Sequence, residues 1–344
     1  MNLVQSPVTH PDSDVVIAKQ PRVLISILNW NGGQKTLKCL DSIKNEDAAT
    51  PAEITTLVID NGSRDEDFLL LEAAARSGDF VLKRLPSNLG FTGGHNISIK
   101  MAVQEGYDFI WLLNNDATVT PGTLAVLLAT MERHARCGAV SPILRDSEDG
   151  TIARCVNTHD WLRRASSRIK SVDEAARIQD AHPESVWVDG TAILFRVQAL
   201  NDAGPLDDRL FAYYDDDDIG VRLANKGWFS RCAFDATVYH DNRKSPASYP
   251  LYLTYLLQRN ELLFWHKNTP PAYRKLLWLK VVDRGLFDVS RLYKHASKAH
   301  GDAALLGLRD FIHKRFGPPA YAGKAPLYLR VACKFAYFLY EKKL

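Results

Sequence analysis

Four consecutive aspartates, Asp215 to Asp218, follow an aromatic stretch that begins at Phe211 and precede a segment with helical spacing. Carboxylates in the first turn of a helix each gain about 0.3–1 kcal/mol from the helix dipole. Successive side chains point about 100° apart around a helix, so the four carboxylates can serve different tasks. One can face a cleft as a base, one can cap the helix, and Asp218 can pair with Arg222 four residues later. An acidic helix start in plain solvent is the alternative, which the flanking aromatic residues disfavour.

Small polar residues stand at the ends of four apolar segments that predict buried strands. These segments cover residues 22–28, 54–60, 80–85 and 109–116. The polar residues are Asn29, Asn31, Asp60, Asn61, Ser63, Asn88, Gly90, Asn114, Asn115 and Asp116. Each is also a common turn former. Four successive strand ends of this kind nevertheless favour a shared binding cleft.

Helical patterns alternate with the four strands, which predicts a mainly parallel sheet with helices on both faces. In such sheets, ligands bind outside the carboxyl ends of the strands. Residues 145–185 are polar and predict a flexible or inserted segment. A later strand ends at His240, and from about residue 248 the pattern is helical and rich in aromatic residues.

Each of three further motifs, taken alone, has both a functional and a purely structural explanation. The segment 87–96 contains three glycines before a helix, and glycine lets backbone N–H groups approach a phosphate or a sugar; a plain turn has the same composition. Asp116 ends an apolar strand, where it can coordinate a divalent cation or cap the following helix. His240 is a candidate metal ligand, although a lone histidine is more often a loop residue.

Charge is unevenly distributed along the chain. Residues 241–344 carry 19 Lys/Arg against 7 Asp/Glu, a balance of +12, and the remainder carries 24 against 33, a balance of −9. The basic tail indicates an anionic partner, such as a membrane surface or a phosphorylated substrate. A solvated basic face is the alternative. No apolar run reaches the roughly 18 residues that span a bilayer.

The five cysteines are far apart and form no CxxC pair. This pattern disfavours a disulfide framework or a zinc site and suits a reducing cytosol. Residues 1–20 show no signal-peptide pattern and predict a mobile, polar leader. The absence of a GxGxxG motif disfavours an NAD-dependent oxidoreductase.

Taken together, the motifs resemble glycosyltransferase family 2, and especially its bacterial rhamnosyltransferase-like and galactofuranosyltransferase-like members. They are "SILNWNG", "VIDNGSRD", "NLGFTGGHN", "WLLNNDATV", "VDGTAILFRVQALNDAGPLDDRLFAYYDDDDIGVRLANKGW" and "VYH". Their order and spacing match over about residues 21–265. The resemblance implies an α/β catalytic domain with the GT-A fold over residues 21–247 and a helical region over residues 248–344. It also implies inverting transfer of a sugar from a nucleoside diphosphate to an acceptor hydroxyl.

The same resemblance implies roles for individual residues on the donor side. The donor-binding residues would be Asn29, Asp60, Asn61, Asn88, Gly90 and Asn115. "NND" takes the place of the family's DxD motif, so Asp116 would bind the Mg²⁺ or Mn²⁺ that bridges the diphosphate. His240 would be a further metal ligand. Because "NND" carries one carboxylate where many relatives have two, we expect modest metal affinity.

On the acceptor side, the family's Glu-Asp pair falls on Asp215 and Asp216. Asp216 would deprotonate the acceptor hydroxyl, with Asp218 as the second candidate for this base, and Asp215 would help to hold the acceptor. The residues that would shape the donor-sugar and acceptor pocket are Trp187, Asp189 and Gly190.

The resemblance also suggests partners. The donor would be a dTDP- or UDP-sugar, with rhamnose or galactofuranose as candidates, and the acceptor a glycan or lipid-linked molecule in bacterial surface polysaccharide synthesis. A basic, aromatic tail fits a cytoplasmic enzyme on the inner membrane face. Alternatively the tail packs on the catalytic domain or forms a homo-oligomer. Nucleic acid is not an expected partner.

Two other function classes remain as alternatives. A sugar-nucleotide nucleotidyltransferase usually has a Gly-rich loop with Arg and Lys after the first strand, and "NWNGGQK" fits that pattern poorly. A protein that binds nucleotide sugar without turnover needs no base, so the aspartate run argues against it.

Overall fold

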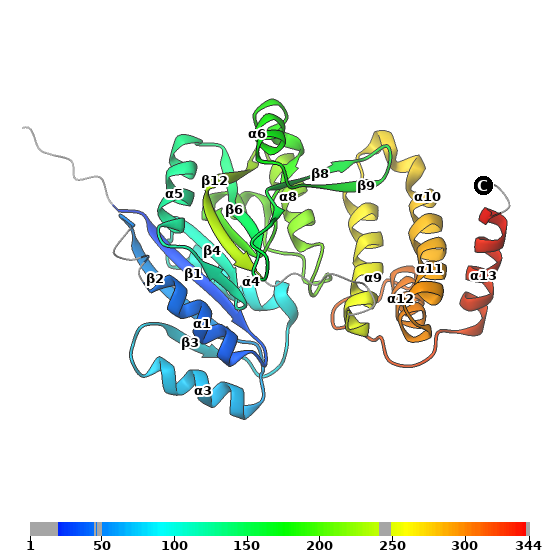
Figure 1. Ribbon diagram of the computed structural model, residues 1–344, viewed down its shortest axis with the longest axis horizontal. Helices are drawn as coiled ribbons and strands as arrows, with labels where there is room; N and C mark the ends of the chain where they lie inside the picture. The colour runs from blue at the N-terminus through cyan, green and yellow to red at the C-terminus, as the bar shows by residue number, and fades with distance from the viewer. Residues whose placement is uncertain (1–19, 45, 47–49, 241–248, 342–344) are drawn as a thin grey trace, which may run out of the picture.

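The computed structural model describes residues 20–44, 46, 50–240 and 249–341. A nine-stranded sheet in the order β3-β2-β1-β4-β11-β6-β12-β5, with β7 beside β6, forms the centre of the described chain, and helices α9 to α13 form a second region next to it (Figure 1). The predicted leader, apart from Gln20, lies outside the described residues.

The strands of the central sheet are β1 (Arg22–Asn29), β2 (Glu53–Asp60), β3 (Val81–Arg84), β4 (Phe109–Asn114), β5 (Ala117–Val119), β6 (Cys137–Asp146), β7 (Ile152–Arg154), β11 (Ala192–Arg196) and β12 (Phe229–His240). Strands β1 to β4 pair in parallel, as the alternating pattern predicts. Strand β11 runs antiparallel to both β4 and β6. Strands β6 and β12 pair in parallel as well. The sheet is therefore mixed, with parallel pairs at the four predicted strands and at β6 and β12.

Two apolar cores lie on opposite faces of this sheet. Successive residues of β1 alternate between them: Val23 and Ile25 face one core and Leu24 faces the other, because side chains along a strand point to opposite faces. Helices α1 (Gly33–Ile43), α3 (Asp65–Ala75) and α5 (Thr123–Arg133) cover the first core. Helices α4 (Gly90–Gln104), α6 (Val172–Ala181), α7 (Val197–Ala203) and α8 (Asp215–Asn225) cover the second. The prediction of helices on both faces is confirmed.

Of the two alternatives for residues 145–185, a flexible or an inserted segment, the structure supports the inserted one. This segment completes β6 and forms β7, the hairpin β8 (Val156–Asp160) and β9 (Ala165–Ile169), and helix α6. With β10 (Val186–Trp187), the hairpin makes a separate three-stranded sheet. Its polar composition suggested flexibility, because few of its residues, among them Cys155 and Val156, pack into the core, and most of β9 is exposed.

The C-terminal region consists of α9 (Leu251–Asn268), η3 (Pro271–Leu276), α10 (Leu277–Val282), the π-turn η4 (Asp283–Phe287), α11 (Asp288–His295), α12 (Lys298–Ile312) and α13 (Leu327–Glu341). Helix α9 is buried along most of its length. It packs on α12 and also contacts α8. The β8–β9 hairpin reaches across to this region (Figure 1), where Arg164 Nη2 lies 3.1 Å from Asp283 Oδ2.

A strained turn at residues 211–214 leads into the aspartate helix α8 and is held by hydrogen bonds from α9. Phe211, Tyr213 and Tyr214 all have φ between 66° and 69°, a conformation that costs bulky residues about 1–3 kcal/mol each. Asn260 of α9 donates from its side-chain nitrogen to the carbonyl oxygens of Leu210 and Ala212, both at 2.7 Å, and lies 3.1 Å from that of Tyr213. Buried hydrogen bonds from the C-terminal region therefore hold the turn that leads into Asp215.

Replacing Asn260 by alanine removes the donor to the part-buried carbonyls of Ala212 and Tyr213, whereas the Leu210 carbonyl still accepts from Arg259 Nη2 at 3.1 Å. We expect Asn260→Ala to lower the free energy of unfolding by about 2–4 kcal/mol, since each unsatisfied buried group costs about 1–3 kcal/mol. Urea unfolding followed by circular dichroism measures the change. Asn201→Ala, at an exposed asparagine of α7, is the control and should change the free energy by less than about 0.5 kcal/mol. Equal stabilities for the two variants would contradict the role of Asn260.

Candidate active site

Buried side chains connect the carboxyl ends of β1 and β2. Asn29 donates to Asp60 Oδ1 at 2.8 Å, and its own side-chain oxygen accepts from Thr36 Oγ1 at 2.9 Å. Asp60 accepts from the backbone N–H of Ser63 at 3.2 Å. Asn115 Nδ2 joins this network through Thr36 Oγ1 at 3.0 Å. Asn29 and Asp60 are fully buried, so in this structure their side chains fix the loops of the cleft.

Asn61 directly follows β2 and connects the end of that strand to the glycine loop, residues 87–96. Its Nδ2 donates to Asn88 Oδ1 at 3.1 Å and to the carbonyl of Gly90 at 3.0 Å, and its Oδ1 accepts from the N–H of Leu89 at 2.9 Å. Gly90 has φ of +77°, and a Cβ there would lie 2.3 Å from the carbonyl oxygen of Phe211. Glycine is therefore required, because the loop packs directly on the strained turn before Asp215.

The predicted metal ligands Asp116 and His240 come together at the ends of neighbouring strands. His240 Nε2 lies 3.1 Å from Asp116 Oδ1, and Lys35 Nζ of α1 lies 3.6 Å from Asp116 Oδ2. Burial acts to raise the pKa of Asp116, but its hydrogen bond to His240 and the charges of His240 and Lys35 hold that pKa below its ordinary value. The carboxylate is thus ionised at neutral pH.

The four aspartates have four different surroundings. Asp215, Asp217 and Asp218 are buried, whereas Asp216 is partly exposed. Asp216 Oδ2 accepts from the backbone N–H of Gly190 at 3.1 Å. Of the four, Asp216 alone combines access to solvent with a fixed position, which is what a base at a cleft needs.

Asp218, the second candidate for the base, is held in an ion-pair network. It accepts from Arg222 Nε at 2.8 Å, as the spacing of four residues predicts, and Lys267 Nζ of α9 lies 2.8 Å from it. Asn268 also donates to it at 2.8 Å. Because Asp218 is buried and already bound to three donors, its role is to join α8 to α9.

Asp215 and Asp217 are buried beside Asp216. Burial, followed by the charge of Asp216, raises the pKa of both well above the ordinary value. His159 Nε2 of β8 lies 2.8 Å from Asp217 Oδ1. The imidazole of His159 also stacks on Trp187, with ring centroids 5.3 Å apart. Through Asp217 and Trp187, the β8–β9 hairpin is attached to the first turns of α8.

The predicted pocket residues Trp187, Asp189 and Gly190 run alongside α8. Trp187 lies over Gly220, where a Cβ would approach the Trp187 Cβ to 2.5 Å. Asp189 accepts from Thr191 N at 3.0 Å and forms an ion pair with Arg154 of β7. Trp187 Nε1 is buried and has no hydrogen-bond partner among the described residues.

Sequence reasoning missed three residues beside this site. Trp30 is 50 % exposed directly after β1, Lys35 neutralises Asp116 from α1, and Arg154 reaches Asp189 from β7. The tryptophan in "NWNGG", directly after a predicted strand, was a signal in the sequence that could have identified Trp30. Lys35 and Arg154 had no such signal, because only the folded chain brings them to the carboxylates.

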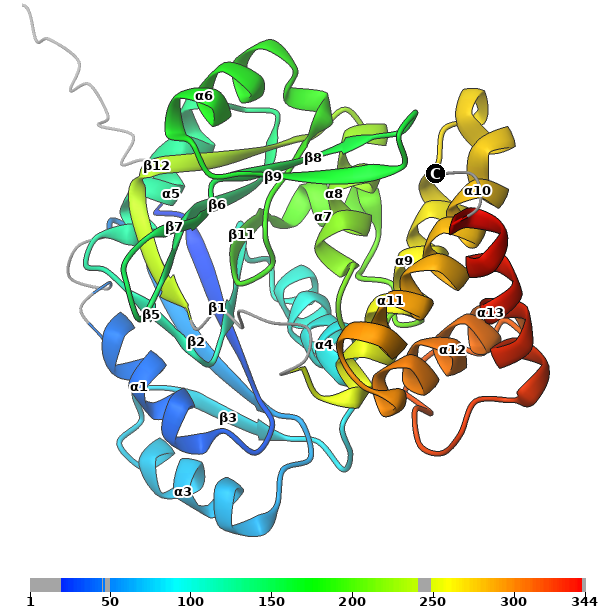
Figure 2. The same cartoon turned by 45° about the vertical axis from the view of Figure 1, so that its right-hand side comes forward.

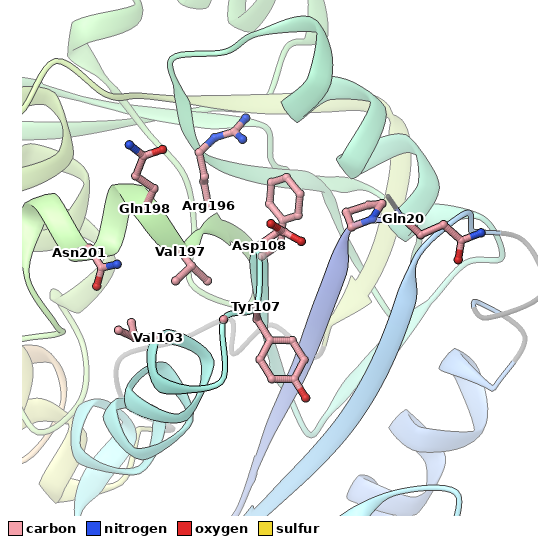
Figure 3. A pocket seen from close by; sticks show the side chains of 11 residues that line it. Gln20, Val103, Tyr107, Asp108, Arg196, Val197, Gln198 and Asn201 are labelled. Atoms are coloured by element: carbon pink, nitrogen blue, oxygen red, sulfur yellow. The ribbon is translucent and has the colours of Figure 1, made fainter. Parts of the chain in front are cut away.

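A hollow of about 490 Å³ lies at the opposite ends of the strands, where β1 and β4 begin (Figure 3). Its charged groups already have partners: Asp108 accepts from the N–H of Arg22 at 2.8 Å, and Arg196 donates to two backbone carbonyls. The strand ends that carry the predicted site point away from this hollow. It contributes nothing to the candidate site.

Among the described residues, no group of three or more His, Cys, Asp or Glu side chains is placed to hold a metal ion. Asp116 and His240 bring two such side chains together. No described helix is long and apolar enough to cross a bilayer.

Residues 24–202 match the sequence profile of the family Glycosyl transferase family 2, over more than half of the 344 residues. The chain belongs to this family. It is a glycosyltransferase, and the resemblance seen in its motifs is confirmed.

Two proteins of Mycobacterium tuberculosis are similar to this glycosyltransferase. An N-acetylglucosaminyl-diphospho-decaprenol L-rhamnosyltransferase is 26% identical over 220 residues, which cover 59% of this chain and 71% of that protein. Galactofuranosyltransferase GlfT1 is 28% identical over 207 residues, which cover 56% of this chain and 66% of that protein.

Solved structures confirm the GT-A-like fold. S. aureus TarS 1-349 in complex with UDP-GlcNAc has a TM-score of 0.56 at 14% identity. The match covers 92% of this chain and 89% of the TarS chain. The mannosyltransferase PcManGT from Pyrobaculum calidifontis, solved with GDP-Man and Mn²⁺, has a TM-score of 0.53 at 16% identity, with coverages of 94% and 82%. At these identities the likeness concerns the fold alone.

One histidine under the glycine loop makes stability depend on pH. His95 of α4 is fully buried, with Nδ1 3.0 Å from Ser26 Oγ, and burial lowers its pKa to about 3. The unfolded chain takes up a proton near pH 6.5, so the stability contributed by the neutral imidazole is complete above that pH and is lost as the pH falls toward 3.

We expect His95 to contribute a loss of about 2 kcal/mol in the free energy of unfolding between pH 7 and pH 5, since each unit below 6.5 costs about 1.4 kcal/mol. Urea unfolding at the two pH values measures it. His95→Gln should lack this part of the change, while His266→Gln, at an exposed site on α9, should keep it. The same pH dependence in both variants would exclude His95 as a source.

Proposed function

We propose that this glycosyltransferase moves a sugar, with inversion, from a dTDP- or UDP-sugar to a hydroxyl of a lipid-linked or glycan acceptor in bacterial surface polysaccharide synthesis. The observation that carries the proposal is the position of Asp216, the partly exposed member of the aspartate run, beside Gly190 at the cleft. The names of the two mycobacterial relatives, a rhamnosyltransferase and a galactofuranosyltransferase, support the sugar classes.

Asp216 acts as the general base in this proposal. The bond from Gly190 N–H to Oδ2 and that from Asp217 N–H to Oδ1, at 3.0 Å, fix the carboxylate plane. The acceptor hydroxyl gives its proton to Asp216 as its oxygen attacks the anomeric carbon from the face opposite the nucleotide. The bond from that carbon to the diphosphate oxygen then breaks, and the nucleoside diphosphate leaves with the electron pair.

In this proposal, Asp116 and His240 lie at the diphosphate of the donor. They would bind Mg²⁺ or Mn²⁺ together with diphosphate oxygens, and Asn115 lies next to them in the chain. When bound, the cation supplies positive charge that stabilises the leaving diphosphate. Lys35, 3.6 Å from Asp116, adds a second positive charge on this side. The exposed ring of Trp30, beside the loops held by Asn29, Asp60 and Asn61, is suited to stack on the nucleobase.

Nucleotide release from a panel of nucleotide sugars tests the function without a known acceptor. With one donor and Mg²⁺ or Mn²⁺, we expect slow hydrolysis that stops when EDTA removes the metal. Asp216→Asn should lower this rate by about 10²–10⁴-fold, the usual share of general base catalysis, and leave donor binding intact by calorimetry.

Asp235→Asn is the matched control, because Asp235 is exposed on β12 and away from α8. This variant should keep the full rate. Failure of every nucleotide sugar to bind in the presence of metal would overturn the proposed donor cleft. A rate for Asp216→Asn equal to that of the unmodified protein would overturn the role of Asp216.

The C-terminal helix offers a surface for a membrane. Helix α13 lies on the outside of the helical region, far from the central sheet (Figure 2). One apolar stripe on this helix is exposed: Leu327, Tyr328, Val331, Phe335 and Phe338 are 75%, 60%, 57%, 62% and 52% accessible. Since residues 241–344 carry a balance of +12, an anionic lipid surface is the partner that fits both the stripe and the charge. We propose that α13 rests on the inner membrane face, where lipid-linked acceptors would be reached.

Co-sedimentation with phosphatidylglycerol vesicles checks this surface. The double variant Val331→Gln, Phe335→Gln should bind at least about tenfold more weakly than the unmodified chain, because two large apolar side chains no longer enter the lipid. Its donor hydrolysis should be unchanged. Leu69→Gln, which replaces a side chain 57% exposed on α3, is the control. Binding that survives the double variant would contradict the assignment of α13.

A further inference from the structure

One face of the small sheet carries polar side chains without partners. Trp187 of β10, Asn157 of β8 and Arg168 of β9 stand directly opposite one another in the antiparallel registers. Directly opposed residues of neighbouring strands lie on the same face of a sheet. These three residues are referred to below as the hairpin row.

Two members of the hairpin row are buried and have polar side-chain atoms without hydrogen bonds to the described residues. Asn157 is fully buried, yet neither Nδ2 nor Oδ1 has a partner among the described residues. The indole N–H of Trp187 is in the same condition. Arg168 is exposed and forms no ion pair with any described residue. Adjacent unsatisfied groups of this kind are rare in folded proteins and indicate a ligand or ordered water.

The hairpin row faces the first turn of α8. His159 is two residues from Asn157 and therefore on the same face, and it contacts Asp217. The positive charge of Arg168 acts on the Asp217 carboxylate and on the guanidinium of Arg154, and it lowers the pKa of each. Arg154 in turn pairs with Asp189, whose neighbour Gly190 binds Asp216. Arg154 thus stands near Asp216 and Arg168 near Asp217, on strands that belong to neither the glycine loop nor the Asp116 side.

We propose that the hairpin row binds a phosphate group of the acceptor, next to the hydroxyl that Asp216 deprotonates. This inference rests on the proposed function. Arg168, the indole N–H of Trp187 and the amide of Asn157 are donors, as a phosphate requires, and guanidinium groups pair with phosphate through two parallel hydrogen bonds. The side-chain oxygen of Asn157 accepts from an adjoining sugar hydroxyl. The donor diphosphate is a poor occupant, because Asp116 and His240 hold it at the ends of β4 and β12.

Two acceptors that differ only in the phosphate test the inference. One is a short-chain alkyl diphosphate ester of N-acetylglucosamine, and the other is the octyl glycoside of the same sugar. We expect a lower acceptor KM for the diphosphate compound. Arg168→Gln should raise that KM about tenfold and leave the KM for the octyl glycoside, the donor KM and the rate of donor hydrolysis unchanged.

A second arginine of the hairpin provides the matched control. Arg163 lies in the turn of the same hairpin, is 84% exposed and faces only Asp160 at 3.6 Å. Arg163→Gln removes the same charge from the same hairpin and should not change the KM for either acceptor. An equal increase for both variants would show general electrostatic attraction and overturn the assignment of Arg168.

Asn157→Leu separates ligand binding from folding. Because the amide of Asn157 has no partner in the described chain, an apolar side chain of similar size should leave the free energy of unfolding equal or higher. We expect this variant to raise the KM for the diphosphate acceptor. An unchanged KM would overturn the role of Asn157, and a KM for the unmodified enzyme that ignores the diphosphate would overturn the whole row. If the enzyme hydrolyses donor but glycosylates neither acceptor, the phosphate site fails while the donor half of the proposed function stands.

Discussion

The hydrogen bonds from Asn260 to the turn at residues 210–213 hold together parts that lie far apart in the sequence. Phe211 and Tyr213 in this turn, and Tyr214 directly after it, have positive φ, and such a conformation persists only where the surroundings over-determine it. On one side, the carbonyl of Phe211 accepts from Thr92 N at 3.1 Å and excludes a side chain at Gly90. On the other, the turn leads into the helix that carries Asp216. Donor loop, base and C-terminal helices therefore share one strained junction.

This junction changes the meaning of the C-terminal region. Asn260 and Lys267 of α9 bind the turn and the Asp218 carboxylate, so the first C-terminal helix is part of the support of the aspartate helix α8. The last helix, α13, lies at the outer side with its apolar stripe exposed. One region thus has two ends with different surroundings: the buried end supports α8, and the exposed end carries an apolar stripe.

Charge is distributed around the site in a consistent way. Burial raises the pKa of Asp215 and Asp217, which lowers the charge density that four adjacent aspartates would otherwise create. Asp218 is neutralised by Arg222 and Lys267. Asp216 keeps access to the cleft because its neighbours in the run are removed from it. Arg154 of β7 pairs with Asp189, and Lys35 of α1 pairs with Asp116.

The sequence by itself determined the parallel strands, the helices on both faces, the family and the grouping of polar residues at the strand ends, because these follow from local periodicity and ordered motifs. It also predicted the bond between Asp218 and Arg222, a contact within one helix. Tertiary structure decided which aspartate is accessible, since that depends on Trp187, Gly190 and α9 packing against α8. It also decided that the polar segment 145–185 forms a hairpin, and that Arg154 and Arg168 stand near the base. These contacts join residues far apart in the chain, and no local pattern encodes them.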